Sequence, residues 1–508
     1  ARHQPTQKQV AARALAEQHH SRQGEAGGGA VVSGSLTARS GEVRVLGEKV
    51  FLENQAYIDA SGEFGGGTVL IGGDYQGKND AIPNAKHTWA GKDTLVRADA
   101  LRKGNGGKVI FWADEATCHY GQISVRGGEE GGDGGFVEVS GPILDYRGFT
   151  DARAPLGNMG ELLLDPNDVV IGAAATTGTF SACPSSYNFV NGTATNQILN
   201  TDLQTQLAAC NVTIDTSSGS AAGGAGPNNG SVTVSSAVTW AANTTLTLTA
   251  NSFMVISAAI TNTSASTGFT AMNFTANGSG ATTNPGISLN AGGVLTTTGG
   301  DVTLNGTSAA VAGGSHGVSF NSGSIVTGSG NISVTGVVPV GSTSFSHGIH
   351  MNTVNGVQTT SGNINMTGST ASSNGGGIVG LFFSQNCATG ATSGTITLSG
   401  TAAVGTGSSA LGLDFFGTVS ANGANISGTG ISNATTGNAS GIQFIAVAST
   451  PGLSTTGNGT ITLNGTSGSS SGSSAGVNLI GTSGSISTVN GAINITGNVL
   501  EVQRQALV

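Results

Sequence analysis

The chain has 508 residues and a formal net charge of −9 at pH 7, yet only 9% of its residues are Asp, Glu, Lys or Arg, against about 25% in a typical soluble domain. Glycine supplies 85 residues and proline only 10, which excludes collagen-like and proline-rich disordered chains. The scarcity of cations argues against nucleic acid as a partner. No apolar run reaches the roughly 18 to 20 residues that a transmembrane helix needs, so we expect no transmembrane segment.

Residues 1–26 differ in composition from the rest of the chain. The stretch KQVAARALAEQHH is rich in helix formers, and Val10, Ala14 and Leu15 recur at helical spacing. An isolated helix of this length is marginal in water. We therefore expect a tail that is either helical or disordered.

Residues 27–172 form a charged region without helical periodicity. The runs EVRVLG, VFLEN, AYIDASG, TVLIGG, KVIFWAD, ISVRGG, FVEVSG and ELLLDP alternate between apolar and polar residues and are bounded by glycine-rich breaks, as is typical of short strands. Few intervening segments could hold the crossover helices of an ordinary parallel sheet. The pattern predicts an all-β coil, a β-solenoid.

Residues 173–508 carry little charge and repeat at a nearly constant interval. Strands such as DVTLNG, NISVTG and TITLNG place their first apolar residue 30 to 35 residues apart, and a second apolar series, in which a glycine precedes each residue, runs in step with it. A repeat of about 32 residues with about three strands predicts one coil of a parallel β-helix. The first series is Val302, Ile332, Ile364, Ile396, Ile426, Ile461 and Ile493, and the second is Val318, Ile349, Ile378, Leu413, Ile442 and Val477.

The first third of the chain contains a specific order of motifs: GEVRVLGEKV, IDASGEFGGGTVLIGGDYQGKN, IPNAKHTWAG, GGDGGFVEVSG and GNMGELLLDPNDVVI. Over about residues 40–172 this order resembles large exoproteins of the filamentous haemagglutinin type, the secreted partners of two-partner secretion systems in Gram-negative bacteria. The resemblance implies a right-handed parallel β-helix exported through an outer-membrane secretion pore. It also implies a secreted or outer-membrane-associated adhesin, whose partner is a host-cell or surface glycan or protein receptor.

From this resemblance we expect an internal segment of a longer exoprotein, acting as structural stalk and adhesin and not as an enzyme. Some proteins of this type are linked to haem use, but the residues predict no cofactor. Two features depart from the family pattern: the helix-like start of the chain and the thiol of Cys118 in the run ATCHYG.

The stretch GGEEGGDGGFVEVSG, residues 127–141, raises the question of a calcium site. Calcium-binding glycine-and-aspartate repeats occur in tandem, so that acids of successive turns share ions. Asp133 has no neighbouring copy of its motif. We therefore predict a corner turn that leads into a strand from Phe136 to Val139, and no metal site.

The alternative function is a β-helix polysaccharide lyase or hydrolase. Such an enzyme needs clustered acids and a basic proton abstractor, for which Lys108 and Arg126 are available. Strand spacing places the acids at corners that face different ways, so we predict no catalytic residues. The acids are Asp114, Glu115, Glu129, Glu130 and Asp133. A third reading, an ice- or crystal-binding solenoid, requires Thr-x-Thr on one face of every coil, whereas these outward positions mix Thr, Ser and Asn.

The four cysteines, Cys118, Cys183, Cys210 and Cys387, permit three complete pairings. Cys183 and Cys210 bracket a 26-residue segment, which a disulfide could close in an oxidising compartment. The alternative is four cysteines that act as small apolar residues.

The histidines are scattered along the chain. Only His347 with His350, and His19 with His20, lie near each other in the sequence. Metal and haem sites draw ligands from several converging residues, so these pairs predict neither.

Overall fold

The structure is a computed structural model, and it is all-β apart from one short α-helix in its described part: 53% of residues are in strands and 3% in helices. The expected parallel β-solenoid is confirmed. The structure describes residues 12–13, 28–173, 195–217, 229–280, 283–309, 314–340, 345–354, 356–371, 377–384, 388–402, 409–434, 437–445, 452–469, 474–480, 486–498 and 500–503.

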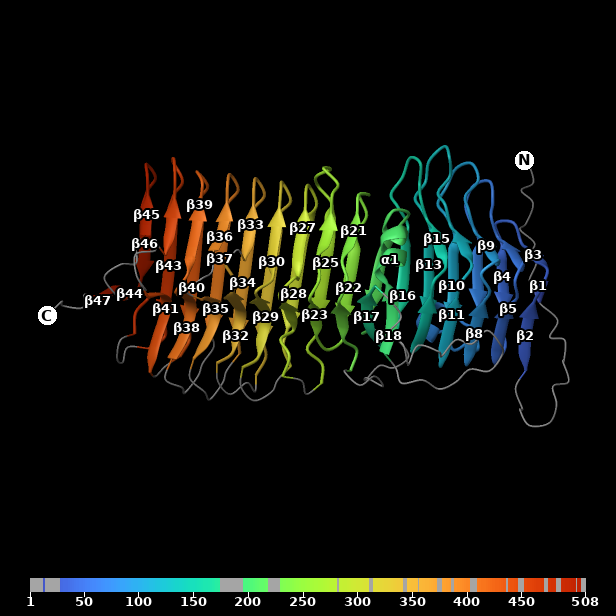
Figure 1. Ribbon diagram of the computed structural model, residues 1–508, viewed down its shortest axis with the longest axis horizontal. Coiled ribbons are helices and arrows are strands. Elements are labelled where there is room, and N and C mark those ends of the chain that lie inside the picture. The colour runs from blue at the N-terminus through green and yellow to red at the C-terminus, as the bar shows by residue number, and fades with distance from the viewer. Residues whose placement is uncertain are drawn as a thin grey trace, which may run out of the picture. The chain divides into compact units, whose positions relative to one another are not determined.

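The chain divides into two compact units. Unit 1 comprises residues 1–230 and 244–248, and unit 2 comprises residues 231–243 and 249–508. In each unit a coil contributes one strand to each of three parallel sheets, and successive strands of a sheet lie side by side (Figure 1). The predicted boundary at residue 172 is one of composition and stays a prediction.

Unit 1 contains three short-stranded sheets. The first has the order β1 (Ala12–Arg13), β4 (Glu42–Val45), β7 (Thr68–Ile71), β10 (Lys108–Trp112), β13 (Phe136–Ser140), β16 (Glu161–Asp165) and β19 (Asn211–Asp215). The second has the order β14 (Ile143–Tyr146), β11 (Ala116–His119), β8 (His87–Ala90), β5 (Lys49–Leu52) and β2 (Gly29–Val32). The third has the order β15 (Phe149–Asp151), β12 (Gln122–Ser124), β9 (Leu95–Arg97), β6 (Tyr57–Asp59) and β3 (Ser35–Thr37). Unit 1 also contains the 3₁₀ helix η1 (Tyr75–Gly77), the paired strands β17 (Asp168–Gly172) and β18 (Thr195–Leu199), and the helix α1 (Asn200–Leu207).

Unit 2 has the same plan with longer strands, and the division between the units falls within β22 (Leu246–Ala250). Its sheet 1 has the order β25 (Thr270–Ala276), β28 (Asp301–Thr307), β31 (Ile332–Val338), β34 (Ile364–Thr370), β37 (Ile396–Ala402), β40 (Ile426–Ser432), β43 (Ile461–Ser467) and β46 (Ile493–Gly497). Its sheet 2 has the order β20 (Val232–Val234), β23 (Met254–Ile256), β26 (Ile287–Leu289), β29 (His316–Asn321), β32 (His347–Asn352), β35 (Ile378–Phe383), β38 (Ser409–Phe415), β41 (Asn438–Ile445), β44 (Val477–Ile480) and β47 (Leu500–Gln503). Its sheet 3 has the order β21 (Val238–Trp240), β24 (Ile260–Asn262), β27 (Val294–Thr297), β30 (Ser324–Thr327), β33 (Val357–Thr359), β36 (Ala388–Ala391), β39 (Thr418–Ala421), β42 (Leu453–Thr455) and β45 (Ile486–Thr488).

The register of sheet 1 in unit 2 confirms the first predicted apolar series. Val302 pairs with Ile332, and the pairing continues coil by coil to Ile493. All members are at most 1% exposed except Ile493, which is 42% exposed. At Gly428, where the ladder of inward side chains is interrupted, an added Cβ would lie 2.9 Å from a methyl carbon of Leu463, so a neighbouring side chain fills the gap.

The second predicted series is wrong at one position. In sheet 2 of unit 2, Ile349 and Leu413 both pair with Leu381, and not with Ile378. Both Ile378 and Leu381 follow a glycine, so the local sequence does not distinguish them. The structure distinguishes them, because Gly380 lies against the backbone of sheet 1, whereas Gly377 lies against the side chain of Phe345.

A glycine contact between sheets 1 and 2 brings two strands of unit 2 together backbone to backbone. A Cβ added to Gly400 on β37 would lie 2.0 Å from the carbonyl oxygen of Gly412 on β38, and one added to Gly380 would lie 2.3 Å from the amide nitrogen of Thr401. Real Cβ atoms do not come this close to backbone atoms. Glycine is therefore required at these positions for its lack of a side chain.

Two elements differ from the sequence prediction. In the predicted tail, Ala12–Arg13 form β1, which pairs with β4, and the other residues of 1–26 lie outside the described residues. The short helix α1 was not predicted, and it buries Leu203, Gln206 and Leu207. In the described part of the chain, no helix combines the length and apolar character that a membrane span requires.

Candidate functional site

The acids that the lyase hypothesis singled out in unit 1 have different partners in the structure. Glu115 lies 3.2 Å from His87, and Glu130 pairs with Arg102 at 2.9 Å. Glu129 is exposed. The remaining contacts are those of Asp114 with Trp112 and Asn84, of Arg126 with Asp151, and of Lys108 with Asp74.

Asp133 lies in a corner turn, as predicted. Gly131 and Gly132 have φ of 125° and 126°, and the turn leads into β13, which begins at Phe136. The carboxylate accepts hydrogen bonds from the backbone and side-chain nitrogens of Asn158 at 2.8 and 3.2 Å. Asp133 thus joins two corners, one coil apart.

Glu138 is a buried acid of unit 1 that sequence reasoning missed. It accepts hydrogen bonds from the backbone nitrogen of Gln76, at 3.1 and 3.2 Å to its two oxygens, and burial raises its pKa to about 7. Gln76 has a left-handed φ of 53° within η1. Further along the same loop, Ile82 packs with Ile110 and Trp112. The carboxylate therefore anchors the η1 loop on the outer surface of the first sheet.

The sequence leaves open whether Cys183 and Cys210 form a disulfide or act as small apolar residues, and the structure favours the second for Cys210. Cys210 is a buried free thiol, and its Sγ lies 3.6 Å from the backbone oxygen of Gln206 in α1. Cys118 is disulfide-bonded, so it is not the free thiol expected from the sequence. Cys183 and Cys387 lie outside the described residues.

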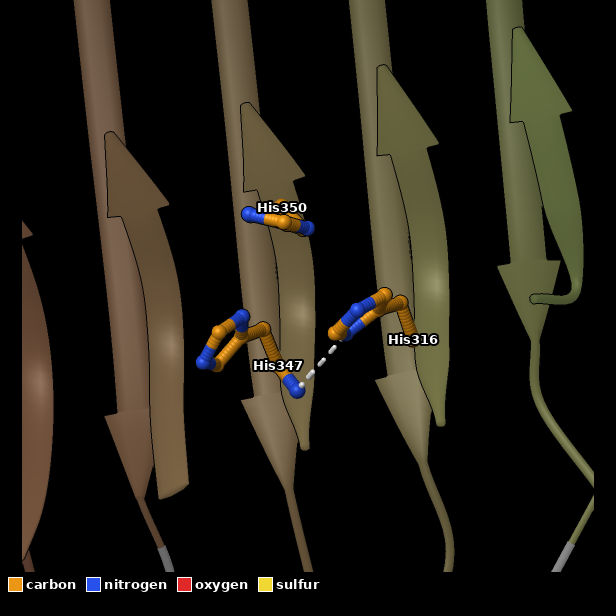
Figure 2. Close-up of side chains that lie close together, drawn as sticks. All are labelled: His316, His347 and His350. Atoms are coloured by element: carbon orange, nitrogen blue, oxygen red, sulfur yellow. Dashed lines mark hydrogen bonds between the residues drawn. The ribbon is translucent and has the colours of Figure 1, made fainter. Parts of the chain in front are cut away.

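Three histidines lie together on sheet 2 of unit 2, although the sequence places them on two different coils (Figure 2). His316 and His347 begin the neighbouring strands β29 and β32, and His350 also lies on β32. The ring centroids are 4.9 Å apart for His316 and His347, 4.6 Å for His316 and His350, and 5.0 Å for His347 and His350. One ligand nitrogen from each ring lies within 4.8 Å of the others. We call this group the histidine cluster.

The strand register explains why these side chains meet. His316 pairs with His347 across neighbouring coils. Strict alternation would send residues three apart to opposite faces of a strand, but the alternation of β32 is interrupted, because the consecutive residues Gly348 and Ile349 are both buried. Gly348 makes the backbone contact with sheet 1, where an added Cβ would lie 2.3 Å from the nitrogen of Ser369. This interruption lets His347 and His350 share one face.

Burial keeps the histidine cluster uncharged at neutral pH. It lowers the pKa of His316 to about 3 and that of His350 to about 4. It also holds the pKa of His347 well below 6.5, with a smaller lowering effect from the two neighbouring imidazoles and an opposing effect from a hydrogen bond of the ring with the backbone of Gly377. Neutral imidazole is the form that binds metal ions.

The hydrogen bonds of the cluster leave ligand atoms available. The backbone nitrogen of His347 donates to Nδ1 of His316 at 3.3 Å (Figure 2), while the buried Nδ1 of His347 has no hydrogen-bond partner in the described part of the chain. Phe382, on the next coil, lies 4.8 Å from the ring of His347 and 5.4 Å from that of His350. The cluster is thus a half-buried set of nitrogen ligands with an aromatic wall.

The sequence held one usable signal for this cluster. His316 and His347 are 31 residues apart, which is one repeat of the solenoid, so they occupy the same place on successive coils. A search for histidines that are close only along the chain finds His347 with His350 and misses His316.

Comparisons with known proteins add no relative: no protein-family model and no curated protein matches the chain. The parallel β-solenoid therefore rests on the structure itself.

Proposed function

We propose that this chain is a structural stalk and adhesive surface of a secreted bacterial exoprotein. The observation that carries the proposal is the outer face of sheet 1 in unit 2, where two rows of uncharged polar side chains run from coil to coil. The first row is Thr303, Ser333, Asn365, Thr397, Ser427, Thr462 and Asn494, and the second is Asn305, Thr335, Thr367, Ser399, Thr429, Asn464 and Thr496.

Every side chain in these two rows is half-buried or exposed. Successive coils repeat the hydroxyl and amide groups at about 4.8 Å, and neither row contains a charged residue. Such a face offers many weak hydrogen bonds at a regular spacing, which together bind a polymer more tightly than any one alone. A neutral, hydroxyl-rich glycan of a host or neighbouring cell is the receptor that this surface suits best.

Export through an outer-membrane secretion pore is the second part of the proposal. It is supported by the order of motifs in residues 40–172, which resembles that of two-partner secretion exoproteins. The chain serves no catalytic role in this proposal, because four of the five acids that a lyase would need have separate structural partners and the fifth, Glu129, is exposed. Its place is the cell surface or the medium outside the cell.

Charge placed on the polar face tests the adhesive role. A variant with Thr367→Lys and Thr397→Lys adds two cations to exposed positions of sheet 1, and Ser420→Lys places one on an exposed position of sheet 3 as a control. Binding to a panel of glycans and host cells is measured for each. We expect binding to fall in the sheet 1 variant and to persist in the control. Equal binding by both variants would remove this face as the receptor site.

The location of the native protein tests the proposed export separately. Intact cells of the source organism are treated with protease, and the chain is followed in the cell and in the medium with an antibody. We expect it in the medium or in a protease-sensitive state on the cells. A chain found only inside protease-resistant cells would contradict export, whatever the purified protein binds.

A further inference from the structure

We propose that the histidine cluster binds one divalent transition-metal ion of the Zn²⁺ type, and that this ion bridges two adjacent coils of unit 2. The ligands are His316 from β29, and His347 and His350 from β32. This site is independent of the polar face on sheet 1 that carries the proposed adhesive function.

The strand pairing fixes most of the required geometry. His316 and His347 are register partners, so their backbones are held at the spacing of adjacent coils. The ligand nitrogens lie within 4.8 Å of one another, whereas nitrogens around a tetrahedral Zn²⁺ at about 2.0 to 2.1 Å are roughly 3.4 Å apart. Side-chain rotation can bring the rings together without moving either strand.

The hydrogen bonds also favour a metal ligand over a closed network. Nδ1 of His347 is buried and has no hydrogen-bond partner in the described residues, which is costly for a polar atom unless something binds it. Nδ1 of His316 accepts only a long bond, 3.3 Å, from the backbone of His347. A bound ion offsets the loss of that bond and engages the unpartnered nitrogen.

The ligand type selects the ion. Three imidazoles suit Zn²⁺, Cu²⁺ and Ni²⁺, while Ca²⁺ and Mg²⁺ require oxygen ligands. A set of three histidines leaves a fourth coordination position for water or for a ligand group. Phe382 covers one side of the cluster, so this open position faces away from its ring.

Packing alone is the competing explanation. The rings of His316 and His347 are stacked with an interplanar angle of 17°, and the aromatic row continues through Phe382 to Phe416 at 5.6 Å. In that case the imidazoles would serve only as aromatic side chains, and added metal would neither bind nor stabilise the chain.

The next coil supplies replacements that the solenoid already tolerates. Val379 occupies the register position of His347, and Phe382 occupies that of His350. The test variants are therefore His347→Val and His350→Phe, prepared in the full chain. The matched control changes His19→Gln and His20→Gln, since two adjacent histidines outside the cluster could also bind metal.

Equilibrium dialysis against Zn²⁺ with elemental analysis gives the stoichiometry, Co²⁺ absorption spectra report nitrogen coordination, and Ca²⁺ serves as the negative control. We expect one Zn²⁺ per chain and a higher unfolding temperature with Zn²⁺, both lost in His347→Val and His350→Phe and kept in the control. Circular dichroism verifies the fold of each variant, and if one fails to fold, the other decides.

Two outcomes would overturn the proposal. One is a wild-type chain that binds no Zn²⁺, which leaves the three rings as packing. The other is binding that survives in a folded cluster variant, or that disappears only in the His19 and His20 variant, since either result assigns the ion to other histidines.

Discussion

Asp414 allows a sharp test of the packing in unit 2. It lies on β38, is 4% exposed, and pairs in register with Phe382 and Gln443. Burial raises the pKa of its carboxyl from 3.8 to about 7, and a hydrogen bond from the side chain of Gln443 opposes this only in part. Asp414→Asn keeps the shape of the side chain and removes its titration.

The sign of the pH effect follows from the two protonation states. The folded chain binds the proton of Asp414 more tightly than the unfolded chain, so stability is greatest below the unfolded pKa and is lost as the pH rises through the folded one. A change of pKa from 3.8 to about 7 corresponds to a free energy on the order of 4 kcal/mol. We expect Asp414→Asn to raise the free energy of unfolding by a few kcal/mol above about pH 7, relative to its effect on that free energy near pH 4.

Hydrogen exchange followed by mass spectrometry measures this effect locally. Peptides that cover β38 and β41 are compared between wild type and variant at pH values from 4 to 8, after correction for the intrinsic exchange rate. Asp301→Asn, at a half-exposed position of β28, is the control for removal of a carboxylate from another sheet of unit 2. A wild-type protection that does not fall with rising pH, or an Asp414→Asn variant with the same dependence as wild type, would refute the reasoning.

Three further outcomes are expected. Gly400→Ala should destabilise unit 2 by about 1 to 3 kcal/mol, because its Cβ would lie 2.0 Å from a backbone oxygen, whereas Gly34→Ala meets nothing within 4 Å and should be nearly neutral in denaturant titrations. Phe415→Ala should cost about 3 to 5 kcal/mol, since the ring is 1% exposed; the partly exposed Phe416→Ala should cost less, and equal losses would contradict the inward assignment. Burial, which raises the pKa of the Cys210 thiol, should prevent its alkylation until the chain unfolds, as mass spectrometry would detect.

The inward ladders were predictable because a solenoid repeats one local pattern many times. The alternation of Val302 and Leu304 is weak evidence for a strand by itself, but its recurrence at about 32 residues determines which residues pair. The prediction failed at Ile378, where two apolar residues each follow a glycine. There the choice depends on the contact of Gly380 with another sheet, which no local pattern contains.

The candidate site was harder to predict than the fold. Placing His350 beside His347 requires the interruption of strand alternation at Gly348, a consequence of backbone contact between sheets 1 and 2. The burial of Glu138 likewise depends on Gln76, 62 residues away, closing over it. Both features arise from tertiary contacts, and alternation within one strand carries no information about them.

A solenoid separates the positions that maintain the fold from those that can carry chemistry. In sheet 2 of unit 2, the inward column stays apolar from coil to coil, while one outward column changes at every coil from β29 to β44. That outward column reads Ser319, His350, Phe382, Asp414, Gln443 and Asn478. It contains both a histidine of the proposed metal site and the carboxyl with the raised pKa. Because the backbone is the same under each of these residues, a single substitution can create a ligand without a change of fold. Sites in such proteins are therefore best sought by comparing residues one coil apart, where the distance along the chain is about 32 residues and the distance in space is about 4.8 Å.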